Sequence, residues 1–237
     1  MKNVMIAGAA LLLFSNAAVA DVRETEEFFD WIALGSDGGD AVEVTAHKKA
    51  GNQEYLDDLV IDIDASSNQV RIETKHPNRS GWFNWSGDSS GSVMYEITVP
   101  SSVELDAIET VNGDVEIDSV GGDVSASTVN GAVTVSGVSS DLDLETVNGS
   151  LKAVLNELGP GQRVKADTVN GTIRIYMPED ASARIVAETV NGSIDAKDFG
   201  LEAEKGFVGR DLEGEINGGD ARVSLSTVNG SIKVKKN

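Results

Sequence analysis

The chain of 237 residues contains no cysteine, only four prolines, and few aromatic residues, which make up 5% of the sequence. Without cysteine it cannot form a disulfide bond, a thiolate nucleophile or a zinc site built on thiolates. Basic residues are also scarce, since 19 lysines and arginines stand against 39 acidic residues and leave a formal net charge of −20. We therefore expect no nucleic-acid partner, because clustered cations are needed to displace counterions from phosphates. Hydrophobic residues still make up 40% of the sequence, which predicts a folded core.

No apolar run is long enough to span a membrane as a helix, which takes roughly 20 residues. One shorter stretch, from Val4 to Phe14, follows Lys2 and precedes Ala18-Val19-Ala20. A positive start, an apolar centre and a small-x-small ending are typical of a secretory signal peptide. We expect residues 1–20 to be a signal peptide that is removed after Ala20. The exported protein would be periplasmic or extracellular and would have no transmembrane segment.

From residue 108 the sequence repeats in units of nine residues. Each unit has an apolar first position, two turn residues at positions five and six, and an aliphatic residue at position eight. Asn-Gly fills the turn positions of every second unit, so the full period is eighteen residues. Thr-Val-Asn-Gly begins at six positions, which are Thr110, Thr128, Thr146, Thr168, Thr189 and Thr227. The long step before the last copy is expected to hold one complete unit without the motif, around residues 208–217. Such a period indicates a solenoid or another repeat array.

Two architectures share this period. Asn-Gly between alternating strands also predicts β-hairpins, and therefore an antiparallel meander. In a parallel solenoid each asparagine lies about 4.8 Å above its counterpart, where side-chain amides can form a ladder, whereas in a meander identical motifs lie two strands apart. We therefore predict an all-β fold, a right-handed parallel β-helix (β-solenoid) with about 18 residues per coil. Asn-Gly would turn each corner because both residues tolerate positive φ. The predicted ladder consists of Asn112, Asn130, Asn148, Asn170, Asn191 and Asn229.

The first half of the chain is less regular. Alternation of apolar and polar residues predicts strands within residues 41–75 and 93–99, and Asp21 to Ile32 reads as a short helix. We expect residues 21–100 to form an irregular N-terminal β region that caps the solenoid of residues 101–237. The two parts would form one continuous domain from about residue 40, because no linker separates them.

The repeated Thr-Val-Asn-Gly, together with segments such as Val42-Glu43-Val44 and Val99-Pro100, resembles the bacterial toast-rack putative adhesin family. The resemblance covers roughly residues 40–237. It implies a β-helical, extracytoplasmic and non-enzymatic protein with a role in adhesion or in envelope-stress sensing. No individual functional residue can be transferred from it.

The sharpest aromatic cluster is Trp82, Phe83 and Trp85, in a loop rich in glycine and serine. Such side chains can stack on sugar rings or anchor a protein, so they are candidate ligand-binding residues. Alternatively they fold back as a lid over the first coil. The nearby Gly87-Asp88-Ser89-Ser90-Gly91 matches a hydrolase pattern weakly, because a strand follows it and the only histidines, His47 and His76, precede it.

Acidic residues recur at position seven of the nine-residue unit, as Asp114, Asp123 and Asp141. A calcium-binding β-roll would need aspartate in every half-coil, and this chain does not have it. We expect no catalytic residue, no metal and no cofactor. The sequence predicts an exported, non-enzymatic, adhesin-like structural or binding module of the cell envelope, with an envelope protein or glycan as partner. The alternatives are a periplasmic component of an envelope-stress sensing system and, less well supported, a carbohydrate-active enzyme, since no cluster of basic residues is visible in the sequence.

Overall fold

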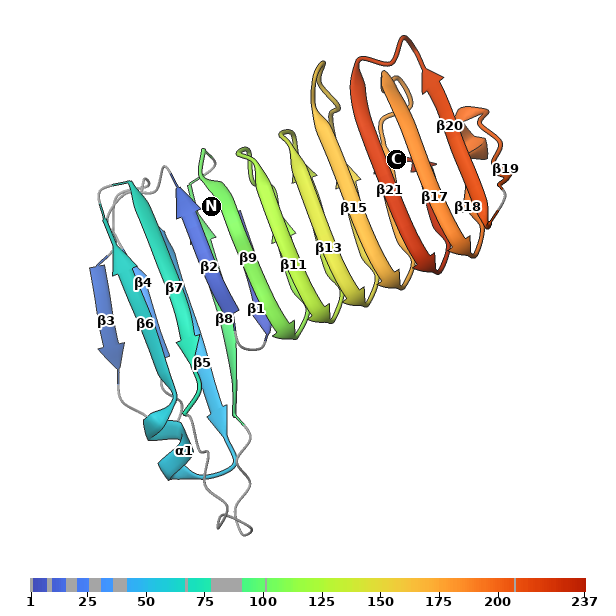
Figure 1. Cartoon of the computed structure of the whole chain (residues 1–237). Coiled ribbons are helices and arrows are strands. Elements are labelled where there is room, and N and C mark those ends of the chain that lie inside the picture. The colour runs from blue at the N-terminus through green and yellow to red at the C-terminus, as the bar shows by residue number, and fades with distance from the viewer. Residues whose placement is uncertain are drawn as a thin grey trace.

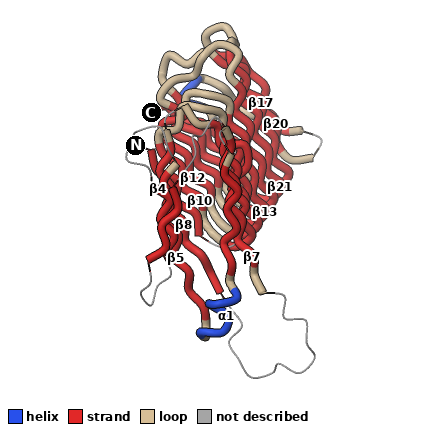
Figure 2. Tube along the Cα trace, turned by 90° about the vertical axis from the view of Figure 1, so that its left-hand side faces the viewer, coloured by secondary structure: helices blue, strands red, loops and turns tan. Residues whose placement is uncertain are grey.

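The computed structural model describes residues 42–66, 68–77, 91–100, 102–206 and 208–237, together with the backbone of four strands between residues 2 and 35. The described part of the chain consists mostly of β-strands in two long sheets, which run along an elongated rod (Figure 1). Two short helices complete the described elements, α1 (Gln53–Asp58) and η1 (Lys197–Phe199). Strands, drawn in red, make up most of the described trace in Figure 2, with loops between them.

Each sheet has eleven described strands. In spatial order, sheet A consists of β18 (Ile194–Asp195), β22 (Ile232–Lys236), β16 (Ile173–Met177), β14 (Leu151–Leu155), β12 (Val133–Val138), β10 (Val115–Asp118), β1 (Lys2–Ala7), β8 (Gly91–Val99), β5 (Glu43–Ala50), β4 (Trp31–Gly35) and β3 (Asp21–Thr25). Sheet B consists of β19 (Glu204–Lys205), β20 (Arg210–Ile216), β17 (Ala183–Asn191), β21 (Ala221–Asn229), β15 (Arg163–Asn170), β13 (Leu142–Asn148), β11 (Val124–Asn130), β9 (Glu104–Asn112), β2 (Ala10–Ser15), β7 (Gln69–Lys75) and β6 (Val60–Ala65).

From β9 to β18 the chain passes alternately from one sheet to the other, and these strands, together with β21 and β22, pair in parallel with their neighbours in the coils. Val115 of β10 lies beside Val133 of β12, and Val133 lies beside Leu151 of β14. Partners along this part of the stack are therefore eighteen residues apart. The prediction of an all-β fold with parallel sheets is confirmed, and the antiparallel meander is wrong for this region.

The core lies between the two sheets and is filled by alternate residues of each strand. In β13, Leu142 and Leu144 are buried, whereas Asp143, Glu145 and Val147 face outward. One cluster of buried side chains, most of them aliphatic, runs from Val42, the residue before β5, to Val234 in β22. Each fully buried Val, Leu or Ile contributes about 1.5–3 kcal/mol to folding, so the continuous core is what holds the coils together.

The last repeat is inserted between two earlier ones. Strand β21 lies between β15 and β17, and β22 lies between β16 and β18. Figure 1 shows β21 in this position, between the lighter β15 and β17. Residues 208–217, expected to form a coil of their own, instead give β20, which pairs antiparallel with β17. The chain thus leaves one coil position empty between β15 and β17. It then pairs β20 with the other edge of β17, and finally places β21 in the empty position.

The N-terminal part of both sheets is antiparallel. Strands β5 and β8 pair across sheet A, and β6 and β7 pair across sheet B. The short helix predicted over residues 21–32 is wrong, because β3 and β4 form there and pair antiparallel with each other and with β5. Strand pairing overrides local helical periodicity when neighbouring edges are available.

Strands β1 and β2 connect the antiparallel part to the coils. Strand β1 pairs with β8 and β10, and β2 pairs with β7 and β9. Both strands lie within residues 1–20, which the sequence predicts to be a signal peptide. Its removal would take one strand out of each sheet at the same level of the rod.

Candidate functional site

The threonine of each Thr-Val-Asn-Gly corner fastens one coil to the next. All six threonines are only 2–5% exposed. The hydroxyl of Thr128 donates to the carbonyl oxygen of Gly113 at 3.0 Å, and Thr146 donates to Gly131 at 3.1 Å. A buried hydroxyl costs free energy unless it is hydrogen-bonded, so this repeated residue is explained by stacking between coils.

The glycine of the motif is required by close approach and not by its backbone angles. A Cβ atom on Gly171 would lie 1.7 Å from the carbonyl oxygen of Gly149 in the neighbouring coil. Among the described residues, positive φ in a residue other than glycine occurs at Ser119 and Asn217, and no corner Asn-Gly adopts it. The expected reason for Asn-Gly is therefore wrong. The backbone of the neighbouring coil fills the space that a side chain would need.

The six asparagine side chains form one series of hydrogen bonds along the rod, the asparagine ladder. In every asparagine except Asn112, which only accepts, the Nδ2 donates to the Oδ1 of the neighbouring asparagine at 2.8–2.9 Å. The spatial order is Asn112, Asn130, Asn148, Asn170, Asn229 and Asn191. The ladder therefore crosses the inserted coil without a break.

The valines of the same motif form a column of apolar side chains on the outer face of sheet B. They are 39–51% exposed, in contrast to the buried threonines beside them. The members of this valine column are Val111, Val129, Val147, Val169, Val228 and Val190. Single exposed valines need no explanation, but an aligned column forms a continuous apolar strip.

A column of mostly acidic residues, the acidic column, runs parallel to the valines, two residues earlier in each strand. Ser127 lies between Glu109 and Glu145 of the neighbouring strands, and Ser226 lies between Asp167 and Glu188. Lys165 is the cation nearest this column and bonds to Glu145 at 2.6 Å. Hydrogen bonds that Lys165 donates to the carboxylates of Glu145, Asp143 and Asp167 raise its pKa above the ordinary value, although burial opposes the shift. On the outer face of sheet B the apolar valine column therefore lies beside a mostly negative one.

The valine and acidic columns, apart from Val190 and Glu188 of β17, line one shallow groove of about 790 Å³, the sheet B groove. It extends from Glu73 and Thr74 of β7, across β9, β11, β13 and β15, to Ser226 and Val228 of β21. The groove therefore crosses the joint between the N-terminal region and the coils, and it includes the inserted coil.

The aspartates at position seven bind backbone groups of the next coil. The Oδ1 atom of Asp114 accepts from the N–H of Ala132 at 2.7 Å, and that of Asp123 accepts from the N–H of Asp141 at 3.1 Å. Burial acts to raise the pKa of Asp141, but hydrogen bonds from the backbone and side chain of Arg163 lower it overall. Within the described ranges, no group of three or more His, Cys, Asp or Glu is placed to hold a metal ion.

The aromatic residues predicted to bind a ligand, Trp82, Phe83 and Trp85, lie outside the described residues, and so does Ser89. His47 lies in β5, and the Nδ1 atom of His76 lies 3.1 Å from the Tyr55 hydroxyl. The described part of the chain contains no helix with the length and hydropathy of a membrane span.

The sequence interpretation missed the valine column. The sequence did contain a signal for the column, since the second residue of the motif is always valine. This valine follows the threonine that faces the core, so alternation places it on the outer face, where an apolar residue is not expected. The sequence interpretation also found no basic cluster. Lys152, Arg174 and Lys233 are far apart in the chain but lie on neighbouring strands of sheet A.

Comparisons with known proteins give one family and one structure. A family model described as Toastrack DUF4097 matches residues 53–235. The crystal structure of a "putative cell adhesion protein" from Clostridium sporogenes ATCC 15579 has a TM-score of 0.47 and 14% sequence identity to this chain, over 86% of this chain and 85% of its own. No curated protein matches the sequence.

Proposed function

We propose that this chain, which belongs to the Toastrack DUF4097 family, is a non-enzymatic, adhesin-like binding module of the cell envelope whose contact face is the sheet B groove. The observation that carries the proposal is the exposed valine column, which the fold repeats in register over six coils. Solvent-exposed apolar strips of this kind mark interaction surfaces. The strip is not needed to close the core, since the buried threonines and aliphatic residues already fill the interior.

The charge of the groove favours a protein partner with basic side chains. Glu109, Glu145, Asp167 and Glu188 stand beside the valines, and the chain as a whole is strongly negative. A second copy of this chain is a poor partner, because its own net negative charge would repel the acidic column. A partner surface with both basic and apolar side chains would complement the acidic column by charge and the valine column by hydrophobicity. The proposed partner is therefore an envelope protein that presents apolar side chains flanked by lysine or arginine. Trp82, Phe83 and Trp85 are proposed as a separate contact.

The proposal includes the finer features of the sequence interpretation. The coils are right-handed, a regular coil has about 18 residues, and residues 1–20 direct export and are removed after Ala20. Removal takes out β1 and β2, so that β8 must then meet β10 and β7 must meet β9 directly. Mass spectrometry of the exported protein is expected to find Asp21 as its first residue. A folded, exported chain that still begins at or before Lys2 would contradict this.

The groove is tested by polar substitution of three central valines. The variant Val129→Ser, Val147→Ser, Val169→Ser keeps the strand-forming backbone and removes the apolar strip. We expect binding of the labelled protein to isolated cell envelopes to weaken by about tenfold or more, because each valine would lose burial against the partner. Equilibrium sedimentation of envelopes with increasing protein concentration measures the change.

The matched control replaces the exposed valines Val60 and Val208, which lie outside the groove, with serine. Both variants should unfold within about 0.5 kcal/mol of the unmodified protein, since the substituted residues are exposed. Unchanged envelope binding by the groove variant, or an equal loss in the control, would overturn the proposed contact face.

A further inference from the structure

Three basic residues lie side by side on the outer face of sheet A. Lys152 of β14 is in register with Arg174 of β16, and Arg174 is in register with Lys233 of β22. Neighbouring strands are about 4.8 Å apart, so the three side chains form a short cationic column. Arg174 and Lys233 are 59 residues apart in the chain and meet only because the last repeat is inserted beside β16.

Asp195 of β18 is in register with Lys233 at the end of the cationic column, but its carboxylate pairs with Lys235. No carboxylate among the described residues lies within ion-pair distance of Lys152, Arg174 or Lys233, although neighbouring cations are paired. In the next column Lys235 bonds to Asp195 at 2.8 Å and to Asp198 at 3.2 Å. Like charges on directly neighbouring strands are destabilising, and this chain has about twice as many acidic as basic residues available. The column therefore needs an explanation other than stability.

A row of arginines on sheet B shows how the same fold neutralises such a column. Arg222 lies in register between Arg163 and Arg184. Asp141 pairs with Arg163 at one end, where the Nε to Oδ2 distance is 2.8 Å, and Glu213 and Glu215 pair with Arg184 at the other. On sheet A the carboxylate at the end of the column, that of Asp195, pairs with Lys235, and within the described chain none pairs with Lys152, Arg174 or Lys233.

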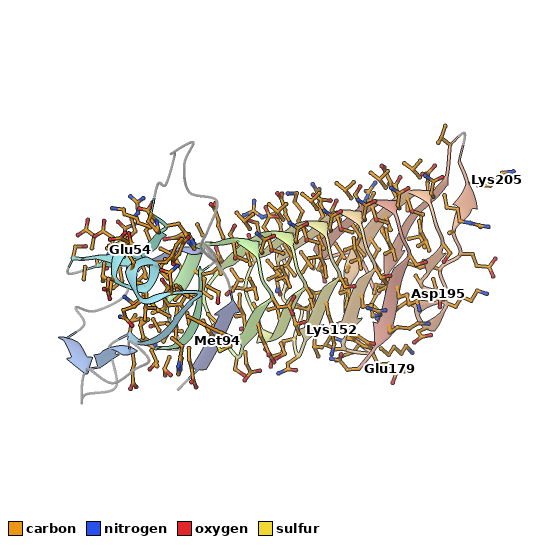
Figure 3. All side chains as sticks on the ribbon, turned by 90° about the horizontal axis from the view of Figure 1, so that it is seen from below. Glu54, Met94, Lys152, Glu179, Asp195 and Lys205 are labelled. Atoms are coloured by element: carbon orange, nitrogen blue, oxygen red, sulfur yellow. The ribbon has the colours of Figure 1, made fainter. Side chains whose placement is uncertain are left out.

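Other groups around the cationic column suit a sugar chain. Ser150, Thr172 and Ser231 each stand two residues before one of the cations, at the corner where β14, β16 or β22 begins. On the other side, the ring of Tyr176 lies next to Lys152, whose Nζ atom is 5.9 Å from the ring centroid. Figure 3 labels Lys152 partway along the rod and Asp195 nearer its C-terminal end. The result is a line of cations with hydroxyl groups on one side and an aromatic ring on the other.

We infer that this surface of sheet A binds a linear acidic polysaccharide, whose carboxylates pair with Lys152, Arg174 and Lys233 in succession. Hydrogen bonds to charged groups are the stronger ones, the hydroxyl residues can bond to sugar hydroxyls, and Tyr176 offers an apolar ring face. The site lies on the opposite sheet from the sheet B groove and does not depend on the function proposed for that groove. A nucleic acid fits less well, because only three cations are available and the remaining surface is negative.

The test uses polygalacturonate as the probe and its fully methyl-esterified form as an uncharged control of the same backbone. The variant Lys152→Gln, Arg174→Gln, Lys233→Gln is expected to bind polygalacturonate about tenfold or more weakly than the unmodified protein in isothermal titration calorimetry. The unmodified protein should bind the ester much more weakly than the acid, and its binding to the acid should weaken as salt is added.

A matched control removes three positive charges elsewhere, with Lys49→Gln, Lys205→Gln, Arg222→Gln. All three of these residues are exposed and lie outside the cationic column. The control should keep its affinity for polygalacturonate. Equal losses in both variants, no binding of the unmodified protein, or equal binding of the acid and the ester would overturn the site. Binding of oligothymidylate as tight as that of polygalacturonate would overturn the ligand class. The valine variants of sheet B should leave this binding unchanged, which separates the two sites.

Discussion

Replacing Gly171 with alanine is expected to lower the free energy of unfolding by about 3 kcal/mol or more. The new Cβ atom would stand 1.7 Å from the carbonyl oxygen of Gly149. The oxygen belongs to the backbone and the position of Cβ is fixed by it, so no rotamer change can move the two atoms apart. The two coils must separate locally, which weakens the Thr168 hydroxyl bond to Gly149 and the asparagine bonds on either side. For a chain of this length the melting temperature should fall by about 6–12 °C.

Gly159→Ala is the matched control for this effect. A Cβ atom on Gly159 would have no neighbour within 4 Å, and its φ is not positive. We expect its melting temperature to stay within about 2 °C of the unmodified protein. Calorimetry or circular dichroism with heating measures both variants. A Gly171→Ala protein as stable as the Gly159→Ala protein would mean that the corners do not stack as closely as described.

Two physical patterns in the sequence were sufficient to predict the repeating part of the fold. Alternation in segments such as Val115-Glu116-Ile117 specifies which side chains face the core, and it is obeyed in β10. The repeated asparagine distinguishes parallel coils from hairpins, because only stacked coils bring identical residues side by side. The family was also recognisable from this repeat.

The order of the coils could not be predicted in the same way. Because the corners are nearly identical, a coil with Thr-Val-Asn-Gly fits beside any other, and the repeat does not state which neighbour it takes. The observed order depends on contacts between irregular segments. The N–H of Gly161 donates to the carbonyl of Asp220, the N–H of Arg222 donates to that of Gln162, and Lys236 pairs with Glu179. These contacts join residues more than fifty positions apart, which no local pattern reveals.

The same limit explains why the two candidate binding surfaces were not foreseen. The cationic column exists only if β22 lies beside β16, and in the chain its members look like isolated charges. The sheet B groove includes Val228 beside Val169 for the same reason. The inserted coil thus contributes to both outer faces, one apolar and acidic, the other basic. The two proposals place a polypeptide partner on the sheet B groove and an acidic glycan on the cationic column of sheet A.

The most direct test of this coil order is a disulfide crosslink between asparagine positions, since the chain has no cysteine of its own. Asn229 is in register with both Asn170 and Asn191, about 4.8 Å from each, whereas Asn170 and Asn191 are about twice that far apart. A disulfide needs Cα atoms about 4.4–6.8 Å apart. On oxidation, Asn170→Cys, Asn229→Cys is expected to form an intramolecular disulfide, detected by mass spectrometry, and Asn170→Cys, Asn191→Cys is expected to keep both thiols free. Efficient crosslinking of positions 170 and 191, with none between 170 and 229, would show that the coils stack in chain order and contradict the inserted repeat.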